Sequence, residues 1–171
     1  MHSNAVEVVQ TFPTYVKAAS QNFINLGAAG VIIAEQLPNN VWEFGSYSRT
    51  PSVFSYYDES VSLIDASSRL KLTSNRLATL ELGGPSSHVY FVQHGSYAAQ
   101  AQKLLGLEVV NANYPMDHTH TAPFLADVHS QAFVLGLKCG TSPLANLVLN
   151  ATARIEVARG PCLSANATIP I

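Results

Sequence analysis

The spacing of hydrophobic and polar residues predicts a helical start to the chain, followed by strands. Apolar residues recur near helical spacing over 15–26, and Gly27 follows as a stop. We therefore expect residues 1–27 to form a helical N-terminal segment, broken into two helices at Pro13. The β-branched residues within 30–37 predict a buried strand.

The middle of the chain has the pattern of short strands joined by tight turns. Two hairpins are predicted, with their tips at 58–60 and 74–75, and a strand–helix–strand unit is predicted over 88–110. The predicted strands are 41–44, 53–57, 61–64, 69–73, 77–82, 88–93 and 107–110, and the predicted helices of this region are 97–105 and 122–137.

The last predicted element alternates between apolar and polar residues over 147–157. Period-two alternation is typical of an antiparallel strand with one buried face. The elements together predict one α+β, β-rich domain over 1–171, with an antiparallel β-sandwich or jelly-roll-like core and three or four helices. Residues 160–171 are expected to form a C-terminal arm, because they end in the apolar Ile169-Pro170-Ile171.

Charged side chains are scarce in this sequence. They make up 12% of 171 residues, with 9 Lys and Arg against 11 Asp and Glu. This balance, without a basic cluster, argues against strong direct binding of nucleic acid. A surface with so few charges must contain neutral, partly apolar patches, which copies of the same chain can cover. We therefore expect a homo-oligomer whose partners are copies of itself.

One polar loop has the residue types of a metal site. Asp117, His118 and His120 lie close together in the sequence, and His129 follows. Imidazoles two residues apart and a carboxylate can share a divalent metal. The preferred interpretation is a polar loop in which Asp117 or Thr121 caps the next helix, and it requires no cofactor. The divalent metal is the alternative.

Three further features carry possible chemistry. Ser96 lies between a predicted strand and a predicted helix, as the nucleophile of an α/β-hydrolase does, but both flanking glycines of that motif are missing, which favours a helix cap. Cys139 and Cys162 permit one disulfide, although a small buried hydrophobe is the preferred interpretation of Cys139. Asn150 and Asn166 begin glycosylation sequons, which stay silent without a secretory signal.

These observations favour a structural subunit of a large homo-oligomer, with a virion coat, decoration or tail protein as the leading example. A small metal-dependent enzyme or ligand-binding β-barrel that uses the loop of Asp117 and His120 is the first alternative. A secreted, glycosylated binding module with a Cys139–Cys162 bridge is the second. The longest apolar run, 26–34, is too short to cross a bilayer, so no membrane contact and a virion or cytoplasmic location are expected.

Overall fold

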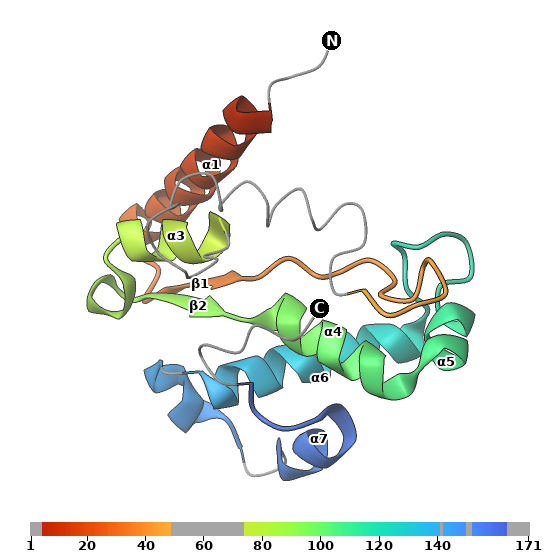
Figure 1. Ribbon diagram of the computed structural model, residues 1–171. Coiled ribbons are helices and arrows are strands. Elements are labelled where there is room, and N and C mark those ends of the chain that lie inside the picture. Colours follow the sequence, from red (N-terminus) through yellow and green to blue (C-terminus); the bar gives the residue numbers. More distant parts are fainter. Residues whose placement is uncertain (1–4, 49–73, 141, 150–151, 164–171) are drawn as a thin grey trace. The chain divides into compact units, whose positions relative to one another are not determined.

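The computed structural model describes residues 5–48, 74–140, 142–149 and 152–163. Helices dominate this described part, and its two strands pair as a parallel sheet (Figure 1). The predicted antiparallel β-sandwich or jelly-roll-like core is therefore wrong. The elements in chain order are α1 (Ala5–Asn25), β1 (Val31–Ala34), α3 (Ser74–Glu81), the 3₁₀ helix η1 (Gly84–Ser87), β2 (Val89–Val92), α4 (His94–Leu105), α5 (Leu107–Ala112), α6 (Pro123–Cys139), the 3₁₀ helix η2 (Pro143–Leu147) and α7 (Thr152–Arg159).

The chain divides into two compact units. The first is formed by Met1–Glu35 and Ser55–Phe91, and the second by Gln36–Phe54 and Val92–Ile171. The interpretation of residues 1–171 as one domain stays a prediction.

The first unit holds α1, β1, α3 and β2 as far as Phe91. One helix, α1, runs through position 13, where the sequence predicted a break. It packs against α3, and Lys17 of α1 forms an ion pair with Glu81 of α3. The backbone N–H of Val31 donates to the carbonyl of His88 at 2.9 Å, which fixes the pairing of β1 beside β2.

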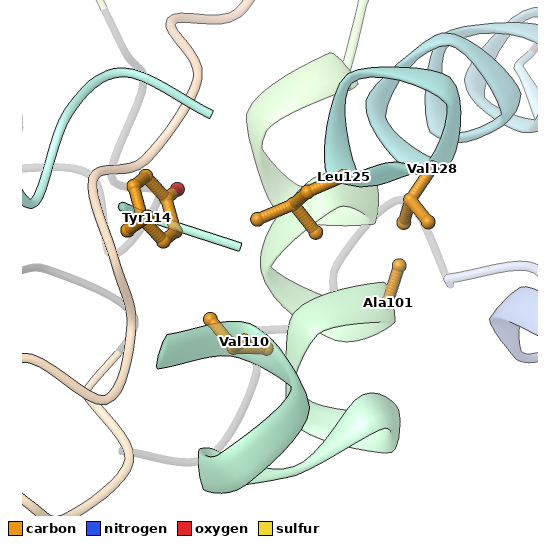
Figure 2. Packing of buried hydrophobic residues seen from close by; sticks show 5 residues of the cluster. All are labelled: Ala101, Val110, Tyr114, Leu125 and Val128. Carbon is orange, nitrogen blue, oxygen red and sulfur yellow. The ribbon is translucent and has the colours of Figure 1, made fainter. Parts of the chain in front are cut away.

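The second unit is a helical layer in which α4 packs on α6 and α6 packs on α7. Figure 2 shows one of its buried clusters, which brings together residues of α4, α5 and α6 with Tyr114 at one side. Fully burying a side chain the size of Leu or Val contributes roughly 1.5–3 kcal/mol. The cluster consists of Ala101, Val110, Tyr114, Leu125 and Val128, with Trp42 and Leu105 at its edge.

Several predicted elements match the structure. The strand expected within 30–37 is β1, and the strand expected over 88–93 is β2. The helix expected over 97–105 is α4, which ends before Gly106 as predicted, and the helix expected over 122–137 is α6.

Other predicted strands are wrong. Residues 77–82 fall mostly in α3, residues 107–110 lie in α5, and the alternating segment 147–157 contains the end of η2 and most of α7. Residues 41–44 form a turn, because the side chain of Asn40 accepts the backbone N–H of Trp42 at 2.9 Å. The strands expected at 53–57, 61–64 and 69–73 lie outside the described residues.

A disulfide ties the end of α6 to the segment after α7. Cys139 is bonded to Cys162, which lies 23 positions further along the chain, and their Cα atoms are 5.4 Å apart. Closing a loop of this size lowers the entropy of the unfolded chain, which is worth about 3 kcal/mol. The expected C-terminal arm is described only as far as position 163, where the backbone N–H of Leu163 donates to the hydroxyl of Tyr97 at 2.8 Å.

Candidate active site

The loop of residues 113–122 joins α5 to α6 and carries the polar cluster of the sequence. Its ends are tied together, because the backbone N–H of Ala122 donates to the carbonyl of Asn113 at 2.8 Å. Its middle is held by Asn40, whose backbone N–H donates to the carbonyl of His118 at 2.8 Å. The loop therefore has a defined conformation although most of its side chains are exposed.

Asp117 and His120 form a hydrogen-bonded pair in this loop. Asp117 Oδ2 lies 2.7 Å from His120 Nδ1, and Asp117 Oδ1 accepts the backbone N–H groups of Thr119 and His120, each at 2.7 Å. An aspartate that accepts amides two and three residues ahead turns the chain back on itself, which brings positions 117 and 120 together. The hydrogen bonds from His120, and after them that from Thr119, hold the pKa of Asp117 well below its usual range.

This geometry determines what the imidazole of His120 can do. An ionised carboxylate only accepts hydrogen bonds, so it holds the imidazole proton on Nδ1. The other ring nitrogen, Nε2, then carries a lone pair and can take a proton from a reacting group. The side chain of His120 is 82% exposed, so that nitrogen is open to a substrate. An oriented histidine of this kind is suited to general base catalysis.

A buried polar network lies beneath the loop. Gln102 of α4 has no exposed surface, and its amide nitrogen lies 3.3 Å from the Tyr114 hydroxyl and 3.1 Å from His129 Nε2. Its amide oxygen accepts the backbone N–H of Val41 at 3.2 Å. Burial raises the pKa of Tyr114 to about 12, and burial followed by the charge of His94 lowers the pKa of His129 to about 4. The network is therefore uncharged at neutral pH.

A cavity of about 480 Å³ opens in the second unit, beside the end of the loop. Thr121 lines it together with His94 and His129, and burial lowers the pKa of both histidines. Its other walls are mostly apolar, so it suits an uncharged group better than an ionic one. The remaining lining residues are Leu37, Ala126, Ser130, Phe133 and Val134.

The structure separates the four predicted metal ligands into different environments. Asp117 and His120 pair with each other, His118 is exposed, and His129 is buried against Gln102. Within the described residues, the one grouping of three possible ligands with closely placed atoms is Cys139, Glu156 and Cys162. Two of these three are joined in a disulfide, so this grouping offers no thiolate for a metal.

The structure also bears on Ser96 and on the two sequons. Ser96 is buried in the first turn of α4, and Gln93 is the cap residue, so the predicted cap at Ser96 is wrong. The predicted sequon residues Asn150 and Asn166 lie outside the described residues. None of the described helices has both the length and the apolar character to cross a membrane.

Sequence reasoning missed Gln102 and Asn40, which hold the loop from below. Both are buried polar residues, with exposed fractions of 0% and 1%. One signal was available for Gln102: it stands at helical spacing from Ala98 and Leu105, on the face of α4 that the core covers. A glutamine on such a face has to find partners for its amide in the interior.

Comparison with known proteins finds similarity to an enzyme. No family model matches the chain. The chain is 34% identical over 139 residues to a rhamnogalacturonan acetylesterase of Emericella nidulans, and the match covers 81% of this chain and 47% of that relative. The chain thus spans about half the length of the curated relative it matches.

This similarity overturns the function inferred from composition. A relative that is an acetylesterase points to a hydrolytic enzyme, and nothing in the comparison points to a virion, a capsid or a tail. The prediction of a virion structural subunit is therefore wrong. The metal site at Asp117, His118, His120 and His129, part of the first alternative, is not tested by this similarity and stays a prediction.

Proposed function

We propose that the chain is an esterase that removes acetyl groups from an acetylated carbohydrate, with Asp117 and His120 as the acid–base pair. The hydrogen bond of 2.7 Å between Asp117 Oδ2 and His120 Nδ1 is the observation that carries the proposal. The similarity to a rhamnogalacturonan acetylesterase supports the substrate class. It makes acetylated rhamnogalacturonan the first polysaccharide to test.

The chemistry follows from the orientation of His120. Its Nε2 takes the proton of an attacking hydroxyl, and the oxygen of that hydroxyl bonds to the carbonyl carbon of the acetyl ester. The resulting imidazolium is stabilised by the ionised Asp117, and it returns the proton to the sugar oxygen when the ester bond breaks. The acetyl group is then bonded to the oxygen of the attacking hydroxyl. Water gives a proton to His120 Nε2 and bonds to the acetyl carbonyl carbon, the bond to that oxygen breaks, acetate leaves, and the imidazolium returns the proton to the oxygen. The proposal assigns the base and its orienting acid, and no residue as the nucleophile.

The exposure of the pair favours a large substrate. A base that is 82% exposed on a surface loop can reach a substituent of a polymer that does not enter a deep pocket. Acetyl groups of a polysaccharide are substituents of this kind.

Acetate release from acetylated rhamnogalacturonan tests the proposal. We expect the full chain to release acetate and His120→Ala to lower kcat by about 10³-fold or more, because the base is lost. His118→Ala is the matched control, since it removes an exposed imidazole two residues away and leaves the backbone carbonyl that accepts from Asn40. The proposal is wrong if the wild-type chain releases no acetate above buffer, or if His118→Ala and His120→Ala lose activity equally.

A further inference from the structure

We infer that Gln102 is a positioning residue for the Asp117–His120 pair, holding the loop that carries it through three hydrogen bonds of one buried amide. The inference rests on the proposed function for its effect on catalysis. Its geometric part, that Gln102 sets the orientation of His120, stands on contacts within the second unit alone.

The orientation of the Gln102 amide is determined by its partners. The backbone N–H of Val41 is a donor only, so the group 3.2 Å away must be the amide oxygen of Gln102. The amide nitrogen then faces the Tyr114 hydroxyl and His129 Nε2. Because an amide nitrogen only donates, His129 Nε2 must accept, and His129 is neutral with its proton on Nδ1. Every bond of the buried amide is thus specified.

Each partner of Gln102 is connected to the catalytic loop. Tyr114 is the second residue of the loop, three positions before Asp117, and His129 lies in α6, which begins as the loop ends. Val41 follows Asn40, whose backbone N–H holds the carbonyl of His118 between the two members of the pair. Gln102 therefore acts on the loop at its beginning, its middle and the helix after it.

A second set of contacts makes the connection through Asn40 rigid. The side chain of Asn40 donates to Asn111 Oδ1 at 2.7 Å and accepts the backbone N–H of Trp42 at 2.9 Å. The indole N–H of Trp42 donates to the backbone carbonyl of Gln102 at 3.2 Å. The segment 40–42 is thus fixed to α4 at Gln102 by two bonds, so loss of the Gln102 amide releases one of them and leaves Val41 without its acceptor.

The test compares the ring of His120 in three variants of the full chain. Nitrogen NMR of labelled histidine reports which ring nitrogen carries the proton, without any need for activity. In the wild type we expect His120 protonated on Nδ1. We expect Gln102→Leu to shift His120 toward the tautomer mixture of a free imidazole and to lower kcat for acetate release by about tenfold or more with little change in KM, because the pair is misplaced.

Gln100→Leu is the matched control for Gln102→Leu. Gln100 lies on the same helix, and its amide nitrogen donates to the backbone carbonyls of Arg159 and Pro161, both at 3.0 Å, away from the loop. Gln100→Leu also removes one side-chain amide from α4, and it is expected to leave the His120 signals as in the wild type. Gln102→Glu is expected to restore the His120 signals and the rate, because its carboxylate accepts from Val41, from the Tyr114 hydroxyl and from a protonated His129.

The outcomes separate the two proposals. Unchanged His120 signals in a folded Gln102→Leu overturn the positioning role, whatever the activity. A shifted His120 in a chain that releases no acetate supports the positioning role and contradicts the esterase. Should Gln102→Leu fail to fold, Tyr114→Phe removes one acceptor of the same amide and keeps the ring, and unchanged His120 signals in that variant also overturn the inference.

Discussion

Asp117 makes three hydrogen bonds within its own loop, and each uses a carboxylate oxygen as the acceptor. Asp117→Asn keeps the size of the side chain but loses its charge and replaces one acceptor with a donor. The amide N–H of the variant then either faces the Nδ1–H of His120, so that two donors meet, or His120 carries its proton on Nε2. In the second case Nε2 cannot accept the proton of the attacking hydroxyl. We expect kcat for acetate release to fall by about 10³–10⁴-fold, measured as initial rates at saturating substrate.

Asp127 provides the control for this substitution. Its carboxylate accepts the side-chain amide of Gln131 at 2.7 Å on the exposed face of α6. Asp127→Asn makes the same chemical change outside the loop and is expected to keep the wild-type rate. Equal losses in both variants, or a full rate in Asp117→Asn, would contradict the role of Asp117 as the orienting acid.

The sequence revealed these residues but not their relationship. Asp117, His118 and His120 were recognisable as a reactive group, and a shared metal was one interpretation of that spacing. The pair depends on a turn in which Asp117 accepts two backbone amides, and a sequence does not state which oxygen meets which N–H. The role of Gln102 was harder to predict, because its partners lie 12 to 61 positions away.

At the scale of elements, the packing of α6 on α4 depends on a glycine. A Cβ atom at Gly136 would lie 2.9 Å from Val92 Cγ1 and 3.3 Å from Tyr97 Cδ2. Alanine gains about 1 kcal/mol over glycine in a helix. Val92 and Tyr97 are 2% and 1% exposed, so neither can move aside, and overpacking costs about 1–3 kcal/mol. We expect Gly136→Ala to lower the free energy of unfolding by about 1 kcal/mol in urea titrations.

Ser130→Ala tests the same helix on its exposed face. This substitution raises helix propensity and adds no atom to the interface between α4 and α6. Apart from the loss of the hydrogen bond from Ser130 Oγ to the carbonyl of Ala126, the variant is expected to be at least as stable as the wild type. A Gly136→Ala variant as stable as Ser130→Ala would show that α4 and α6 have room for the methyl group.

Helices with clear stop signals were predicted well. Of the predicted strands, those within 30–37 and 88–93 are strands, whereas 77–82, 107–110 and 147–157 are largely helical. Gly106 ends α4, and Pro123 lies in the first turn of α6. Both residues favour a helix end through their own backbone, whatever the rest of the fold. The alternation over 147–157 predicted a strand, but its alanines, arginine and glutamate favour a helix, and Ile155 of α7 packs against the cluster around Tyr97. The sequence of 147–157 is compatible with both strand and helix periodicity, and the tertiary contacts of α7 favour the helix.

At the scale of the whole molecule, a shortage of charge proved a poor guide to function. A chain with 12% charged residues has few charges to place on its surface, but this shortage does not distinguish a shell subunit from an enzyme. The similarity to an acetylesterase over 139 residues points to a hydrolytic enzyme and away from a virion subunit. Composition limits the class of partner, whereas the reaction depends on a few side chains and their geometry.

Stability of the second unit should fall as the pH drops below neutral, because His129 is buried without charge. Burial, then the charge of His94, lowers its pKa to about 4 from 6.5, and its hydrogen-bond partner Gln102 is neutral. The unfolded chain takes up the proton first, so this loss begins near pH 6.5, reaches about 3 kcal/mol at pH 4 and then levels off. His129→Gln keeps an acceptor for Gln102 without titrating. Urea unfolding at pH 7 and pH 4 should therefore show a smaller decrease in this variant, and an equal decrease would exclude His129 as its source.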